Sequence, residues 1–289
     1  MSTSVVALLA DRGVVSLSGA DAVDFLDNIA TNDLSNVPTG EARFAGLLTP
    51  QGKILFEFFA LRTEDGWLLE TRADRAGDLI KRLTLYKLRA KVTIADVSAE
   101  YGAAVAWGPV KPNVDGGWVY ADPRHGDLGW RILAPRDGLS GEPVPEERYH
   151  ERRIELGIAE GGHDYVLGDT FPHEANYDRQ HGVSFTKGCF VGQEVVARMQ
   201  NKSVIRKRVT LVTGTEPLQT GAEIRIGAAV IGTLGTVAGP HGLALLRHDR
   251  AAEAADKGEP LVAGTSTIIA DTTALDRYRA GVAARAPAP

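Results

Sequence analysis

The spacing of apolar residues in the first 90 positions alternates between a pattern typical of strands and one typical of helices. Short apolar runs bounded by turn residues predict strands at 5–10, 14–17, 45–48, 54–61 and 67–70. Apolar positions at helical spacing predict helices over 22–30 and 73–89. Asp11-Arg12-Gly13 separates the first two apolar runs and predicts a hairpin between them. This order of strands and helices is typical of one ferredoxin-like α+β half.

The following positions predict a second α+β half and then a change of architecture. Strands are expected at 92–97, 103–107, 118–121 and 130–133. A helix is expected over 145–156, because Pro145 suits a first helical turn. From Val209 onward, strand-like runs alternate with glycine-containing turns, which predicts a small β-barrel or sandwich interrupted by a helical patch at 249–256. The Ala/Arg/Pro-rich end, 279–289, is expected to be mobile.

Composition is that of a soluble globular protein long enough for two or three domains. The 289 residues are 44% hydrophobic and 24% charged, with a net charge of -5. This acidic balance argues against a general nucleic-acid binder. No apolar run approaches membrane-spanning length, and Met1-Ser2-Thr3-Ser4 lacks the basic segment that opens a signal peptide. We therefore expect a cytoplasmic, bacterial protein with no membrane partner.

The single cysteine, Cys189, lies in the octet Lys187-Gly-Cys-Phe-Val-Gly-Gln-Glu194. Gly192 falls where a helix is expected to start, so backbone N–H groups and the helix dipole would favour a thiolate, and Lys187 adds a positive charge. The alternative is a buried cysteine that acts as a small hydrophobic residue. One thiol does not complete a metal or cluster site, so any cluster held here needs ligands from a second subunit, a partner protein or a small thiol.

This octet resembles the Lys-Gly-Cys-(Tyr/Phe)-x-Gly-Gln-Glu signature of the YgfZ family. Members of that family bind tetrahydrofolate, are related in fold to the glycine-cleavage T protein, and maintain or assemble iron–sulfur clusters. Further segments that resemble the family are 19–22, 31–34, 49–53, 88–92, 153–158 and 172–176.

The resemblance implies an α+β, GcvT-like folate-binding fold, with two ferredoxin-like halves around a central channel, followed by a small C-terminal β-barrel. The domains implied are a folate-binding region over 1–208, with subdomains 1–95 and 96–208, a barrel over 209–275 and a mobile tail over 276–289.

The resemblance also implies contacts with the folate. Glu155, in an Arg-x-Glu-x-Gly context similar to that of the T proteins, is expected to accept the adjacent N–H donors of the pterin. From spacing alone, Glu155 would equally be a surface helix residue that pairs with Arg152. Asn32, in Thr-Asn-Asp, corresponds to a motif that lines the ligand channel in relatives. Asn and Asp also end helices without binding any ligand.

Basic residues follow the cysteine octet at 198, 202 and 206–208, and a smaller cluster contains Arg89 and Lys91. Such residues form a solvated face, bind nucleic acid, dock an acidic partner or attract the glutamate tail of a folate. We expect the last role for Arg198, which lies one helical turn from Glu194. Lys187, Gln193 and Arg89 complete the expected cofactor-binding set.

Conventional aminomethyltransferase activity is not expected. T proteins keep an Asp-Asp pair shortly after a glycine-containing hairpin, and counting from Gly52 places Phe56 and Glu57 at the matching positions. The Glu57 side chain is expected to point outward on its strand. Because an ångström of misplacement costs about a hundredfold in rate, this change disfavours that reaction.

The expected function is therefore that of a folate-binding protein that supports assembly or repair of iron–sulfur clusters in 4Fe–4S enzymes. Its cofactor would be tetrahydrofolate or a one-carbon derivative, and Cys189 would be the reactive group. Cys189 would either hold a transient cluster with a partner's thiols or accept a one-carbon or sulfur adduct. Expected partners are A-type cluster carriers or scaffolds and client enzymes. The alternatives are a folate-dependent one-carbon transferase acting on a small amine and, least favoured by charge, a tRNA-binding or tRNA-modification accessory protein.

Overall fold

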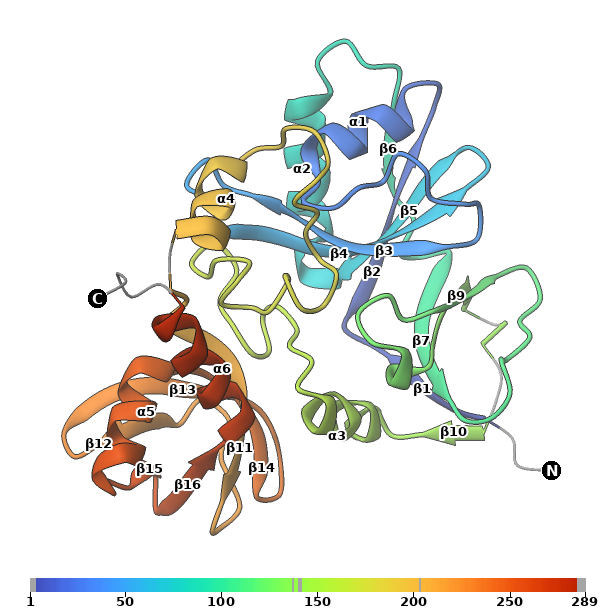
Figure 1. The fold of residues 1–289 in the computed structure, drawn as a ribbon. Helices are drawn as coiled ribbons and strands as arrows, with labels where there is room; N and C mark the ends of the chain where they lie inside the picture. The colour runs from blue at the N-terminus through green and yellow to red at the C-terminus, as the bar shows by residue number, and fades with distance from the viewer. Residues whose placement is uncertain (1–3, 137, 140–141, 203, 285–289) are drawn as a thin grey trace. The chain divides into compact units, whose positions relative to one another are not determined.

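The structure, a computed structural model, describes residues 4–136, 138–139, 142–202 and 204–284 (Figure 1). The chain forms two compact units. The first unit comprises Met1–Tyr149 and Asp178–Gln193, and the second comprises His150–Tyr177 and Glu194–Pro289. Each unit is therefore assembled from two separate stretches of the chain.

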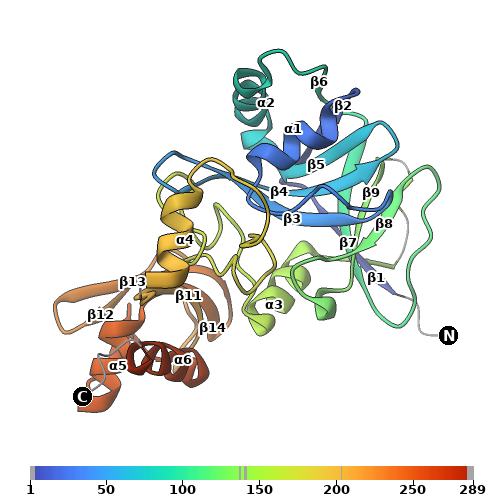
Figure 2. The ribbon, with the colours of Figure 1, turned by 45° about the horizontal axis from the view of Figure 1, so that its top comes forward.

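One sheet of the first unit carries both early helices on the same face (Figure 2). Its strand order is β3-β4-β5-β2-β6, and every pairing is antiparallel. The strands are β2 (Arg12–Ser18), β3 (Ala42–Leu48), β4 (Ile54–Thr63), β5 (Gly66–Arg72) and β6 (Thr93–Asp96). The helices α1 (Ala22–Ile29) and α2 (Ala73–Lys87) bury their apolar stripes in one core with the sheet, including Leu26, Leu79 and Leu83.

A second sheet completes the first unit, in the order β10-β1-β7-β9-β8. Its strands are β1 (Val5–Leu9), β7 (Tyr101–Trp107), β8 (Trp118–Ala121), β9 (Trp130–Pro135) and β10 (Glu142–Val144). The strand β10 lies parallel to β1, and the other pairs are antiparallel. A short 3₁₀ helix, η1 (Gly126–Leu128), precedes β9, and α3 (Glu146–Leu156) follows β10.

Two sequence predictions about pairing are wrong. The strands β1 and β2 do not form a hairpin, because β1 pairs with β7 and β10 whereas β2 pairs with β5 and β6. The run at 92–97 does not open the second half, because β6 pairs with β2 in the first sheet. In both cases a local turn signal indicates a change of direction, but the partner of each strand is chosen by contacts far along the chain.

The second unit contains the predicted barrel, which is closed, in the order β11-β14-β13-β12-β15-β16. Its strands are β11 (Lys207–Gly214), β12 (Glu223–Ile226), β13 (Ala229–Ala238), β14 (His241–Arg247), β15 (Leu261–Ala263) and β16 (Ser266–Ala270). The predicted helical patch is α5 (His248–Lys257).

The segment expected to be a mobile tail, 276–289, begins inside a helix. The helix α6 (Thr272–Ala283) starts at Asp271, whose side chain accepts a hydrogen bond from the Thr273 N–H, and it buries Ala274 and Leu275. The end of the expected tail, 285–289, lies outside the described residues.

Candidate functional site

The cysteine loop, defined here as Lys187 to Gly192, is anchored at its first residue. The Lys187 ammonium donates to the main-chain oxygens of Ala30 and Asn32, both at 3.0 Å, and also to that of Asp27. Its side chain is 3% exposed and also approaches the Asp27 carboxylate at 3.4 Å. Burial lowers the pKa of Lys187, and Asp27 opposes that effect. Lys187 therefore neutralises the carbonyl-rich end of α1 and fixes the loop to it.

The other end of the loop packs against the β3–β4 hairpin. Gly192 has φ +82°, and a Cβ on it would lie 2.7 Å from the Thr49 carbonyl oxygen and 2.9 Å from the Gly52 Cα. Only glycine fits this conformation and this approach without displacing the hairpin. The helix α4 (Gln193–Lys202) starts at the next residue, as predicted. Between the two anchors Phe190 is buried and Cys189 is exposed. The loop therefore presents its thiol to solvent from a fixed base.

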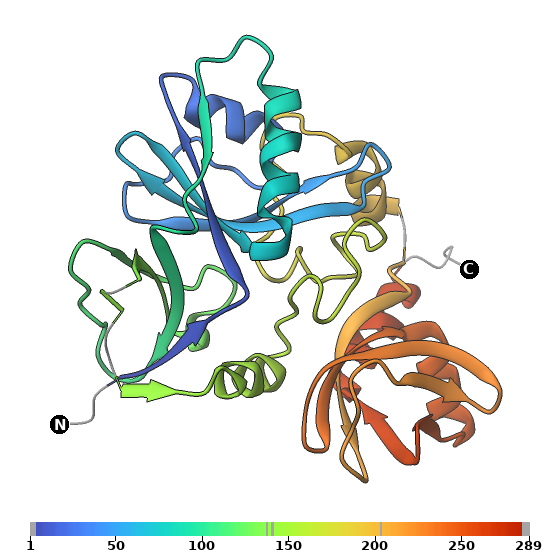
Figure 3. The same cartoon turned by 180° about the vertical axis from the view of Figure 1, so that it is seen from behind.

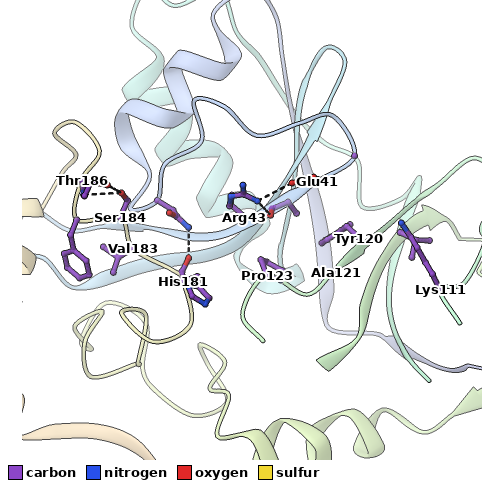
Figure 4. A pocket seen from close by; sticks show the side chains of 15 residues that line it. Glu41, Arg43, Lys111, Tyr120, Ala121, Pro123, His181, Val183, Ser184 and Thr186 are labelled. Atoms are coloured by element: carbon purple, nitrogen blue, oxygen red, sulfur yellow. Dashed lines mark hydrogen bonds and ion pairs between the residues drawn. The ribbon is translucent and has the colours of Figure 1, made fainter. Parts of the chain in front are cut away.

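A cavity of about 830 Å³ lies beside the segment that leads into this loop (Figure 4). Its walls come from β3, β8, a loop at Lys111 and residues 181–186. Arg43 and Lys111 bring positive charge, and Glu41 pairs with Arg43 at 3.7 Å. The cavity therefore offers both positive charge and apolar surface to a ligand that carries negative charge.

Asn32 lines this cavity, but its amide is already engaged. The side-chain NH₂ donates to the carbonyl oxygens of Phe44 at 2.8 Å and His181 at 2.6 Å, and the side-chain oxygen accepts from the Asp33 N–H at 2.9 Å. The preceding Thr31 hydroxyl donates to the Gly182 carbonyl at 2.7 Å. Thr31 and Asn32 thus hold the 181–184 segment against β3 and shape the wall of the cavity.

A second polar cluster is buried between the two sheets of the first unit. Glu70 on β5 accepts from Arg12 at 3.0 Å and from Arg131 at 3.0 Å. Asp122 pairs with Arg124 at 2.7 Å and with Arg131 at 3.2 Å. Burial opposes ionisation of both carboxylates, but the arginines outweigh it, and the pKa values of Glu70 and Asp122 are lowered. We refer to these five residues as the buried charge network.

Two aromatic groups connect this network to its surroundings. The Arg131 guanidinium lies 3.9 Å from the centre of the Phe59 ring, and that of Arg124 lies 4.7 Å from it. The Tyr120 hydroxyl donates to Glu70 at 3.2 Å, and Tyr120 also lines the cavity. The network therefore supports one wall of the cavity from behind.

Comparison with known proteins adds the following. The GCVT N-terminal domain model matches residues 9–114, and the CAF17 C-terminal beta-barrel domain model matches residues 206–275. The mitochondrial iron-sulfur cluster assembly factor IBA57 of Mus musculus is 33% identical over 82% of this chain and 76% of its own length. The human protein is 33% identical over 79% and 71%. The chain belongs to the IBA57 family.

Other IBA57 relatives and the solved structures set limits to this likeness. Over 75% of this chain, the sequence is 34% identical to the IBA57 homologue of Mycosarcoma maydis. The match spans 60% of the length of that homologue and 52% of the length of the homologue of Neurospora crassa. Glycine cleavage system aminomethyltransferase T from Bartonella henselae superposes with a TM-score of 0.73 at 15% identity, over 93% of this chain and 85% of that one. At this identity the match shows the fold alone. It confirms the predicted GcvT-like α+β fold with its C-terminal barrel.

The expected cytoplasmic localisation is wrong by this comparison. The IBA57 relatives are named as mitochondrial proteins, whereas the expectation relied on the composition of the first few residues. Among the described residues, none of the helices is both long and apolar enough to cross a membrane.

The structure brings four of the seven predicted site residues of this IBA57-family chain together. Lys187, Cys189 and Gln193 follow one another in the loop and at the start of α4, and Asn32 lines the cavity and accepts a hydrogen bond from Lys187. The remaining three lie elsewhere. Glu155, near the end of α3 in the second unit, is exposed, and Arg198 on α4 is exposed and pairs with Glu194 at 3.1 Å. Arg89 is exposed just beyond α2 and does not line the cavity.

The expectation for Glu57 is wrong. Its side chain is only 5% exposed and does not point outward into solvent. Phe56 on the opposite face of β4 is 3% exposed and belongs to the apolar core with α1 and α2. One face of β4 packs against α1 and α2, and the other face is buried inside the first unit. Because both faces are buried, the alternation of side chains along this strand does not distinguish core positions from solvent-exposed ones.

Sequence reasoning missed Arg43, Lys111 and His181 in the cavity and all five residues of the buried charge network. His181 has φ +54°, which is unusual for a residue other than glycine. It lies six residues before Lys187, so proximity to the octet could have singled it out. Arg43 and Lys111 have no such signal, since they converge only through the pairing of distant strands.

Proposed function

We propose that this protein supports the assembly or repair of 4Fe–4S clusters and that Cys189 is the group that meets the cluster. The observation that carries the proposal is the exposed thiol on a loop fixed at both ends. A thiolate is a preferred ligand of iron–sulfur clusters and the nucleophilic form of cysteine. The relatives named as iron-sulfur cluster assembly factors support the same role.

In this proposal the cluster is cargo that a partner brings and takes away. One thiol supplies one ligand, and the described residues contain no group of three or more His, Cys, Asp and Glu side chains placed to hold a metal ion. The other ligands therefore come from a second protein, for which a cluster carrier or scaffold of the A-type and client 4Fe–4S enzymes are the proposed partners. Transfer then requires that the partner reach Cys189, which its exposure permits. Acceptance of a one-carbon or sulfur adduct by the same thiol is the second form of this chemistry.

Tetrahydrofolate is the proposed cofactor, and the cavity fits it in size and charge. A volume of about 830 Å³ lies in the range of pockets for drug-sized ligands. Arg43 and Lys111 would hold the carboxylates of the glutamate tail, and the apolar walls would take the rings. A bound folate would supply a carrier of one-carbon units. Glu155 and Arg198 are also proposed as folate contacts on the family resemblance, with Gln193 at the start of α4. None of these three residues lines the cavity, so the two sets of residues are alternative locations for the folate.

The test is a spectroscopic titration with tetrahydrofolate, with and without a carrier protein loaded with a cluster. We expect wild type to take up the cluster chromophore from the carrier. We expect Cys189→Ser to lose this uptake but to bind folate with unchanged affinity. Glu155→Gln is expected to weaken folate binding, whereas Glu151→Gln on the same helix serves as the matched control. Uptake by Cys189→Ser at the wild-type rate would refute the role of the thiol.

The alternative, a folate-dependent one-carbon transferase, has less support. Phe56 replaces one of the carboxylates that T proteins use, and it is sealed in the core. Turnover of a methylated amine with tetrahydrofolate, lost in Glu155→Ala but kept in Cys189→Ala, would favour the transferase over cluster assembly.

A further inference from the structure

The end of α2 carries a surface that the proposed function does not use. Leu85 is 69% exposed and Leu88 is 89% exposed, and they lie three positions apart on one side of the helix end. Figure 3 shows α2 on the outer side of its sheet, with its last turn leading through 88–92 into β6. Large apolar side chains left this open cost solvation without contributing to the core.

Leu88 is also held in an unfavourable backbone conformation. It follows the last residue of α2 with φ +47° and ψ -106°, a conformation outside the left-handed helical region that glycine adopts far more readily than a residue with a Cβ. A leucine there raises the energy of the folded chain, and its side chain recovers nothing by packing because it points into solvent. The fold alone would favour glycine at this position.

The charge around these leucines is concentrated and of one sign. The segment 81–91 contains the basic residues Lys81, Arg82, Lys87, Arg89 and Lys91 and no acidic residue, in a chain whose net charge is -5. Lys81 pairs with Asp78 at 3.3 Å, and Arg82 lies over the Tyr86 ring at 5.8 Å. Among the described residues, the side chains of Lys87, Arg89 and Lys91 have no hydrogen-bond or ion-pair partner.

Acidic residues near this segment are already engaged. Asp21 accepts a hydrogen bond from the Lys91 main-chain N–H at 2.7 Å, and Asp78 also pairs with Arg75 at 3.5 Å. These two carboxylates offset only part of the positive charge of the five basic residues in the segment. An apolar pair bordered by unpaired positive charge is complementary to an acidic surface that carries apolar side chains.

We propose that Leu85, Lys87, Leu88, Arg89 and Lys91, called here the α2-end patch, dock an acidic protein segment that presents apolar side chains. The two leucines supply the desolvated centre of the contact and the three cations its rim. Nucleic acid fits less well, because the patch centre is aliphatic and offers no aromatic ring for a base to stack on. The assignment stands independently of Cys189 and gives Arg89 a role other than folate binding.

The proposal is tested on the full chain by fluorescence anisotropy with three labelled probes. One is a helix-forming peptide rich in glutamate with leucines at helical spacing, the second is the same peptide with alanine in place of leucine, and the third is a tRNA. We expect wild type to bind the leucine peptide at least about tenfold more tightly than the alanine peptide. Reversing the charge of the rim with Lys87→Glu, Arg89→Glu and Lys91→Glu together should weaken the affinity for the leucine peptide by at least about tenfold.

Leu88→Gly separates docking from folding. Glycine accepts φ +47° without strain, so the melting temperature should stay unchanged or rise while binding of the leucine peptide falls by several-fold. Leu85→Ser should also weaken binding of this peptide. Matched controls on the barrel unit are Arg277→Glu, which reverses an exposed cation, and Ile269→Ser, which removes a side chain 67% exposed. Equal binding of the two peptides, wild-type affinity in both leucine variants, or tighter binding of tRNA than of the leucine peptide would overturn the proposal.

Discussion

Two groups of charged residues in the first unit are built in opposite ways. In the buried charge network, carboxylates and arginines satisfy one another out of reach of solvent. In the cysteine loop, the Lys187 ammonium donates hydrogen bonds to main-chain oxygens, and the candidate reactive group, the Cys189 thiol, is exposed to solvent. The pKa values of Glu70 and Asp122 in the network are lowered, and that of Tyr120, which donates to Glu70, is raised. The pKa of Lys187 in the loop is lowered as well, so a shifted pKa does not distinguish the two groups, whereas the exposure of Cys189 on its fixed support does.

The largest loss of stability is expected from breaking the buried charge network. Glu70→Gln leaves Arg12 and Arg131 buried without their carboxylate, so the free energy of unfolding should fall by about 3–5 kcal/mol. Urea unfolding measures this change. Glu41→Gln removes a carboxylate that pairs with Arg43 at the surface and should change stability by less than about 1 kcal/mol. Similar losses in the two variants would contradict the contrast between buried and exposed pairs.

Acid should destabilise the protein through the same network. The folded-state pKa values of Glu70 and Asp122 are lower than their unfolded values. Their contribution is therefore fully present above the unfolded values, near about 4, and is lost as pH falls through the folded ones. Stability followed by urea titration should decline steeply below about pH 4 in wild type. The decline should be shallower in Glu70→Gln, and identical slopes would argue against the network as its source.

A smaller effect is expected from releasing the loop. Lys187→Met removes the donor for the Asp27, Ala30 and Asn32 main-chain oxygens and should cost about 1–3 kcal/mol. Hydrogen exchange should accelerate over 181–193, and Lys111→Met at the cavity rim is the matched control. If Lys187 acted instead as the thiol's charge partner, the variant would slow alkylation of Cys189 and leave exchange unchanged.

The smallest effect on stability is expected at the thiol itself. Because Cys189 is exposed, Cys189→Ser should change the free energy of unfolding by less than about 0.5 kcal/mol. Cluster uptake from a loaded carrier should nevertheless be abolished. A large loss of stability would show that the sulfur is a packing group and not a presented one.

The sequence predicted the elements of this fold better than their partners. The helices α1 and α2 and the closed barrel follow from apolar spacing and glycine-marked turns, because these signals are local. The separation of β1 from β2 does not, since each strand finds its partners at a distance. The prediction that the Glu57 side chain points outward failed for the same reason, because burial of both faces of β4 depends on elements remote in sequence.

The residues of the candidate site were likewise predicted where the signal is local and missed where it depends on distant contacts. Cys189 could be singled out because a lone thiol between glycines is a local pattern with chemical meaning. The partners of Lys187 lie 155 to 160 positions before it, so its sequence context indicated a charge beside the thiol and not an anchor in α1. Arg43, Lys111 and the arginines of the network likewise acquire meaning only when the two sheets meet.

The placement of β1 has a consequence for how the chain is made. Its pairing with β10 joins Val5 to Glu142, and the first unit also needs 178–193, which follow part of the second. The first unit therefore cannot close before residues far along the chain have been made. Contacts this remote slow folding and leave strand edges open to aggregation. The first unit therefore closes only after residue 193 has left the ribosome.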